Sequence, residues 1–102
     1  MNDKINISDL PEFDIAEHLD NGQAIADYLT IVMEEGDPSA LAEALGSVAR
    51  AHGMTEIARA SGISREALYK ALRPNAQPRF ETVAKVCKAM GVRLTAQPMV
   101  GP

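Results

Sequence analysis

The stretch from Met54 to Leu72, MTEIARASGISREALYKAL, constrains the fold most, because it has the pattern of two short helices joined by a tight turn. Gly62 separates the two helical parts, at a point where the turn needs positive φ or a close backbone approach. In the second part, Leu68 and Leu72 recur at the spacing of a buried helix face. We therefore expect a helix–turn–helix in which the helices pack closely.

A hydroxyl side chain stands near the start of each of these helices, Thr55 in the first and Ser64 in the second. Such a hydroxyl can accept a hydrogen bond from one of the free backbone N–H groups at a helix N-terminus. We predict helices over residues 55–61 and 64–72, with Thr55 and Ser64 as their caps.

The other face of the second helix carries long polar and aromatic side chains at i, i+1, i+4 and i+5: Arg65, Glu66, Tyr69 and Lys70. Side chains of this kind on the second helix of such a pair can reach base edges in a DNA major groove, the N-terminal ones first. The alternative is an ordinary helical hairpin whose outer face is only solvated. We favour DNA binding.

Two prolines fix the loop that follows, Arg73–Arg79. Arg73, Asn75 and Arg79 can all donate hydrogen bonds to phosphate oxygens. Because a loop just beyond a groove-binding helix commonly contacts the DNA backbone, we predict these three residues as phosphate contacts.

The net charge of −4 averages two unlike halves of the chain. Residues 1–49 contain one basic and eleven acidic residues, whereas residues 50–102 contain nine basic and three acidic ones. The basic half suits phosphate, and the acidic half suits a basic protein partner. An acidic surface that only keeps the protein in solution is the alternative for the first half.

Apolar residues recur at helical spacing in three further stretches, bounded by helix-starting and helix-ending residues. They predict helices over residues 22–35, 38–52 and 80–90. Asp20 or Asn21 can cap the first of these, and Asp37 the second, with Pro38 in its first position.

The predicted buried faces of these three helices include Met33, His52 and Phe80. Cys87 also lies on the apolar face of the third helix, so we interpret it as a core residue rather than a nucleophile. After that helix, apolar and polar residues alternate over Val92–Gln97, which predicts a short strand.

The remaining features argue against several classes of protein. With one cysteine and two histidines, the chain shows no nucleophile–base pair and no metal-spaced cluster, so we expect no enzyme activity, no cofactor and no metal site. No apolar run approaches the ~20 residues that span a membrane, and the N-terminus lacks the pattern of a secretory signal. We expect a cytoplasmic protein without a membrane partner.

The run from Ala44 to Leu72, followed by FETVAKVCKAMGVRL, resembles the probable addiction module antidote proteins, relatives of HigA-type antitoxins with a Cro/C1-type helix-turn-helix domain. The resemblance continues upstream through FDIAEHLDNGQAIADYLTIVMEEGDPSALAEALG and so covers nearly the whole chain. It implies an all-α, phage-repressor-like fold of five helices with short extended ends. The domain would span residues 37–97, with the acidic segment 1–36 packed on it.

The resemblance also implies a function, that of an antitoxin in a type II toxin–antitoxin module. Such a protein binds a RelE/HigB-like toxin and, as a homodimer, represses its own operator DNA. By analogy, the DNA contacts fall on the following positions: Thr55, Ser64, Arg65, Glu66, Tyr69 and Lys70. Many phage-type repressors begin the first helix of the motif with a Gln pair, whereas this chain has Met54-Thr55-Glu56 in that region. The alternative is a stand-alone helix-turn-helix regulator without a toxin partner.

Overall fold

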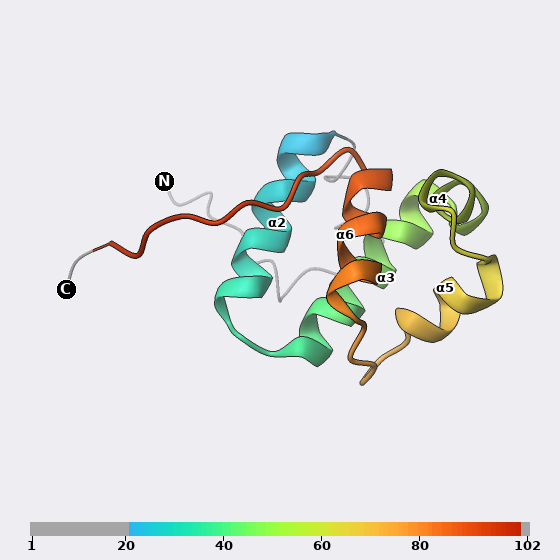
Figure 1. Ribbon diagram of the computed structural model, residues 1–102, viewed down its shortest axis with the longest axis horizontal. Coiled ribbons are helices and arrows are strands. Elements are labelled where there is room, and N and C mark those ends of the chain that lie inside the picture. The colour runs from blue at the N-terminus through green and yellow to red at the C-terminus, as the bar shows by residue number, and fades with distance from the viewer. Residues whose placement is uncertain (1–20, 101–102) are drawn as a thin grey trace, which may run out of the picture.

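Residues 21–100 are described in a computed structural model, and this part of the chain forms five helices (Figure 1). In chain order they are α2 Gly22–Glu34, α3 Pro38–His52, α4 Met54–Ser61, α5 Arg65–Ala71 and α6 Phe80–Ala89. No strand forms within these residues. The predicted all-α class is confirmed, and every helix begins and ends within one residue of its predicted limits. The expectations for residues 1–20 lie outside the described part.

Side-chain caps explain why α2 and α3 begin where they do. The Asn21 side chain accepts a hydrogen bond from the backbone N–H of Ala24 at 2.9 Å. The Asp37 carboxylate accepts one from Ser39 N–H at 3.0 Å, and Pro38 occupies the first turn of α3, where no N–H is needed. Of the two candidates for the cap of α2, the structure therefore selects Asn21.

One aliphatic core holds all five helices together, and no polar or charged side chain is buried in it within residues 21–100. α2 packs on α3, α3 packs on α4, and α4 contacts both α5 and α6. The largest fully buried side chains come from all helices except α4: Ile25, Leu29, Leu45, Val48, Leu68, Val86 and Cys87. Burying an aliphatic side chain of this size stabilises a fold by roughly 1.5–3 kcal/mol.

Three residues assigned to buried faces are exposed instead. Met33 is 41% exposed at the next-to-last position of α2. Phe80 is 75% exposed because it is the first residue of α6, one turn before Val83, where that helix begins to face the core. His52 is exposed at the last position of α3. Helical spacing did not predict the exposure of these three residues, which all lie at or next to the end of a helix.

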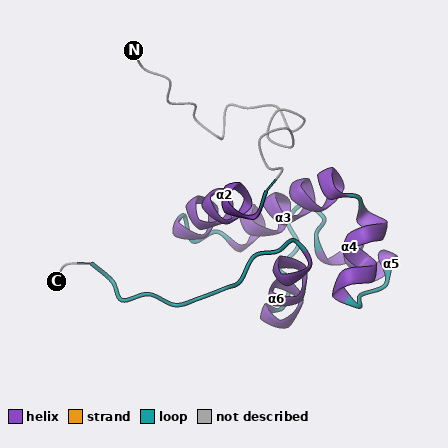
Figure 2. Cartoon of the chain, turned by 90° about the horizontal axis from the view of Figure 1, so that it is seen from above, coloured by secondary structure: helices purple, strands orange, loops and turns teal. Residues whose placement is uncertain are grey.

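The predicted strand at Val92–Gln97 is wrong, although this segment is extended. A strand needs a second strand to pair with, and none of the residues 21–100 forms one. Val92 and Leu94 are half-buried against the core, and residues 95–100 are exposed. Figures 1 and 2 show that this last part leads away from the helices past α2.

The α2 helix and the α4–α5 pair lie at opposite ends of the helical part of the molecule (Figures 1 and 2). The acidic first half of the chain therefore contributes α2 to one end, and the basic second half contributes α4 and α5 to the other. Ligands bound at the two ends would not compete for the same surface.

Candidate nucleic-acid interface

A three-residue turn, Gly62–Ser64, joins α4 to α5. Gly62 has φ 75°, in the left-handed region that glycine adopts without strain. The backbone N–H groups of Gly62 and Ile63 both donate to the carbonyl oxygen of Ala58, at 3.0 and 3.2 Å. The turn is therefore fixed by backbone hydrogen bonds, and the role predicted for Gly62 is confirmed.

The two predicted hydroxyl caps differ in outcome. Ser64 is the N-cap of α5, and its Oγ accepts a hydrogen bond from the Ala67 N–H at 3.1 Å, as predicted. The cap predicted at Thr55 is wrong. The α4 helix begins at Met54 after Gly53, which leaves Thr55 inside its first turn, exposed and beyond the position from which a side chain can cap.

The inner side of α5 is anchored by Leu68 and Leu72, which are 0% and 2% exposed. Leu72, the C-cap residue of α5, also contacts the middle of α3. A Cβ atom added at Gly46 would lie 2.9 Å from the carbonyl oxygen of Leu72, so only glycine fits there. We did not anticipate Gly46 from the sequence. Its signal was a glycine inside a predicted helix, which usually has a packing reason.

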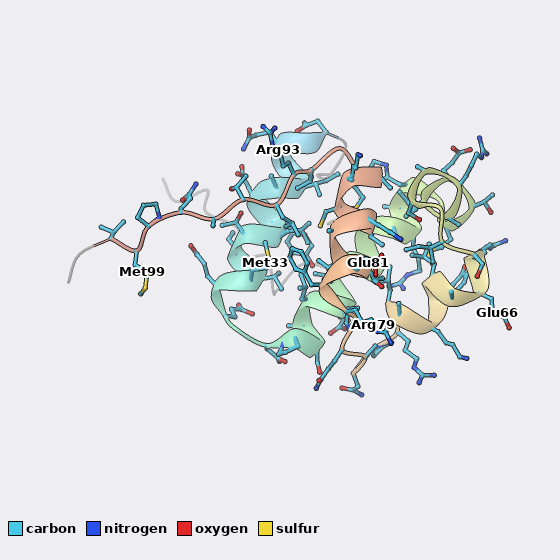
Figure 3. The ribbon with its side chains drawn as sticks, viewed as in Figure 1. Met33, Glu66, Arg79, Glu81, Arg93 and Met99 are labelled. Carbon is cyan, nitrogen blue, oxygen red and sulfur yellow. The ribbon has the colours of Figure 1, made fainter. Side chains whose placement is uncertain are left out.

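The outer side of α5 presents Arg65, Glu66, Tyr69 and Lys70 to solvent, each of them exposed. Figure 3 shows Glu66 pointing away from the rest of the fold, at the end of the molecule formed by α4 and α5. Tyr69 is 45% exposed, so much of its side chain is open to solvent. A short helix anchored on one side and lined with long polar side chains on the other can enter a DNA groove.

Arg65 and Tyr69 contact each other on this outer face. The guanidinium carbon of Arg65 lies 5.5 Å from the centre of the Tyr69 ring, and its Nη2 donates to the phenolic oxygen at 3.3 Å. The i, i+4 spacing on α5 brings these side chains together. The pair joins two predicted site residues into one unit that the sequence did not reveal.

The loop from α5 to α6 carries the three predicted phosphate contacts, Arg73, Asn75 and Arg79, all exposed. A hydrogen bond from Ala76 N–H to the Arg73 carbonyl oxygen, at 3.1 Å, closes a turn in which Asn75 adopts φ 70°. Asn tolerates this conformation better than most residues. Figure 3 shows Arg79 at the start of α6, on the side of the molecule where α5 ends.

Thr55 lies on α4, apart from the other predicted residues, and its neighbour Glu56 carries a negative charge in the first turn of that helix. The Glu56 carboxylate accepts a hydrogen bond from Arg59 Nη2 at 2.8 Å. The side chains are 65% and 71% exposed, so the ion pair adds little stability. The ion pair balances charge locally, since Arg59 offsets the negative charge of Glu56.

Cys87 is 1% exposed in the core between the helices, which confirms its predicted place. Desolvation by burial raises the pKa of its thiol to about 11. The reactive thiolate is therefore scarce near neutral pH. Among residues 21–100, no three His, Cys, Asp or Glu side chains are grouped so that they could hold a metal ion. Within the same range, no helix combines the length and the apolar character that crossing a membrane requires.

Comparison with known proteins agrees with the resemblance seen in the sequence. Residues 9–98 match the family model described as probable addiction module antidote protein. A protein of Haemophilus influenzae, described as uncharacterized, is 46% identical over 88 residues, which cover 86% of this chain and 91% of that protein. No solved structure gives a significant match. The chain therefore belongs to the family of probable addiction module antidote proteins.

Proposed function

We propose that this protein is the antitoxin of a type II toxin–antitoxin module, that it silences a RelE/HigB-like toxin, and that it represses its own operator DNA. The family supports the antitoxin role. The observation that supports DNA binding is the outer face of α5, where Arg65, Tyr69 and Lys70 are all exposed while Leu68 anchors the helix from below.

In this proposal α4 and α5 form a helix-turn-helix of the Cro/C1 type. The N-terminal turn of α5, beginning at Arg65, faces base edges in the major groove. Lys70 and the loop residues Arg73, Asn75 and Arg79 contact phosphates and fix the orientation of the helix on the duplex. A homodimer places two copies of α5 one turn of DNA apart, ~34 Å, on a pseudo-palindromic operator.

The toxin has two candidate binding surfaces. The first is the acidic part of the chain, where Asp27, Glu34 and Glu35 are exposed on or beside α2, away from α5. RNA-cleaving toxins need a basic surface for their substrate, and acidic side chains could cover it. The second is the extended segment Val92–Gln97, which could add a strand to the toxin or to a second copy of this chain.

Co-expression with the product of the neighbouring gene, followed by co-purification, tests the antitoxin role. We expect a stable complex, and a mobility shift of the promoter fragment by the antitoxin alone or by that complex. DNA binding without any co-purifying partner would instead favour a stand-alone regulator. Absence of both would contradict the whole proposal.

Variants in which neutral amides replace the acidic side chains test where the toxin binds. We expect the triple variant Asp27→Asn, Glu34→Gln, Glu35→Gln to weaken toxin binding. The matched control changes the net charge equally on other helices: Glu56→Gln, Glu66→Gln and Glu81→Gln. Equal toxin affinities for the two triple variants would contradict the α2 surface. Deletion of residues 1–20 tests the acidic residues there, and retained affinity would contradict their role.

A further inference from the structure

We propose that Arg65 and Tyr69 act as one reading unit for guanine in the major groove, in which Tyr69 is a positioning residue that holds the Arg65 guanidinium toward the base. This inference rests on the proposed DNA binding by α5. It goes further because it names the base that is read and gives Tyr69 a role separate from any contact of its own with DNA.

The contact geometry shows how Tyr69 restricts Arg65. The guanidinium carbon lies 5.5 Å from the ring centre, and Nη2 donates to the phenolic oxygen at 3.3 Å. The ring face and the hydroxyl therefore hold the same guanidinium through two different interactions. A long arginine side chain loses much conformational freedom when it binds, and a partner that orders it beforehand reduces that cost.

The donors of Arg65 remain available for a ligand. A guanidinium carries five N–H groups, and the bond to Tyr69 engages one of its nitrogens. Arg65 makes no ion pair within residues 21–100, whereas Arg59 on α4 is paired with Glu56. Arg65 therefore has no carboxylate partner among these residues, and its remaining donors lie on an exposed face.

Guanine matches these donors better than the other bases do. In the major groove its O6 and N7 atoms are adjacent acceptors, which a guanidinium can contact through two parallel hydrogen bonds. Adenine presents an acceptor beside an N–H donor, and the donor opposes the guanidinium. Arg65 is also the first residue of α5, in the turn of such a helix that lies nearest the bases.

Tyr69 variants separate positioning from direct contact. Tyr69→Phe keeps the ring and removes the hydroxyl, and Tyr69→Leu removes both interactions with Arg65. Because Tyr69 is 45% exposed, we expect both variants to fold, and their thermal unfolding is measured alongside. Lys70→Ala is the matched control on the same helix face, because it removes a predicted phosphate contact and leaves the pair intact.

The probe is a random duplex DNA library, from which the wild-type protein selects its preferred sequence. Affinity is then compared between that duplex and one in which 7-deazaguanine, which lacks N7, replaces the preferred guanine. The ratio of the two affinities measures the preference for guanine. We expect this ratio to be roughly threefold lower than wild type in Tyr69→Phe, roughly tenfold lower in Tyr69→Leu, and unchanged in Lys70→Ala. Arg65→Ala should abolish the preference, and Tyr69→Leu should then add nothing further in the Arg65→Ala background.

Two results would overturn the inference, and they are distinguishable. If Tyr69→Leu weakens binding to every duplex equally and keeps the guanine preference, Tyr69 contacts DNA directly and the reading unit does not exist. If the wild-type protein selects no sequence and binds no duplex, the proposed DNA binding fails and the reading unit fails with it.

Discussion

Gly46 in α3 faces the carbonyl oxygen of Leu72 so closely that a Cβ atom on Gly46 would lie 2.9 Å from it. The middle of α3 thereby sets how deeply the end of α5 can sit in the fold. The obstacle is a backbone atom, which cannot move aside as a flexible side chain can.

We expect Gly46→Ala to destabilise the protein. Overpacking lowers the free energy of unfolding by roughly 1–3 kcal/mol, and the better helix propensity of Ala offsets about 1 kcal/mol of this loss at most. Thermal unfolding should show a lower midpoint, while Glu43→Ala on the exposed side of the same helix should stay within about 0.5 kcal/mol of wild type. A more stable Gly46→Ala protein would contradict the close approach of α3 to α5.

Substitution of the two hydroxyl residues should separate the true cap from the wrongly predicted one. Ser64→Ala removes the hydrogen bond to Ala67 N–H and should lower the free energy of unfolding by about 1 kcal/mol. Thr55→Ala removes no cap and should change it by less than about 0.5 kcal/mol. Urea unfolding of both variants measures the difference, and equal losses would show that Thr55 has a structural role after all.

Arg65→Ala and Lys70→Ala should weaken DNA binding in different ways. If Arg65 contacts a base, its loss should cost about 1–3 kcal/mol on the preferred sequence and relax the base preference there. Loss of Lys70 should weaken binding to all duplexes alike. It should also reduce the slope of log affinity against log salt concentration by about one, because one fewer counterion is released. Binding measured at several salt concentrations on two duplexes distinguishes them. Uniform weakening by Arg65→Ala would make Arg65 a phosphate contact.

The buried thiol should make stability fall at alkaline pH. Burial raises the pKa of Cys87 from its ordinary 9.0 to about 11, so between these values the unfolded chain loses a proton that the native state keeps. The free energy of unfolding therefore keeps the full contribution of the protonated thiol below pH 9 and loses it progressively as the pH rises toward 11. Between about pH 8 and about pH 10 we expect wild type to lose about 1 kcal/mol more than Cys87→Ala in urea unfolding. Parallel losses in the two proteins would show that another group is responsible.

The helices could be predicted from the sequence because local chemistry specifies them. Apolar spacing, Asp37 followed by Pro38, and Gly62 at the turn each act within a few residues of the position they determine. The cap formed by Ser64 could be predicted for the same reason, because it depends only on Ala67, three residues away. The face of α5 could likewise be assigned, since Leu68 defines the inner side and the exposed residues follow from helical geometry.

Most of the features that could not be predicted depend on residues distant in sequence. Gly46 is required by the carbonyl of Leu72, and Phe80 is exposed although it lies one turn before the buried Val83 on α6. The Val92–Gln97 alternation is typical of a strand, but a strand also needs a partner that the sequence pattern cannot supply. The contact of Arg65 with Tyr69 is local, yet it depends on rotamers that spacing alone does not fix.

The α5 helix has seven residues and buries one side chain of its own, Leu68. An isolated helix this short does not persist in water, so α5 depends on its contacts with the rest of the fold. Because it buries only one side chain of its own, those contacts are few. Its amide hydrogens should exchange with deuterated solvent through local opening, well before those of α3. A duplex that requires the helical form would slow this exchange, and the same measurement would then locate the bound DNA on the chain.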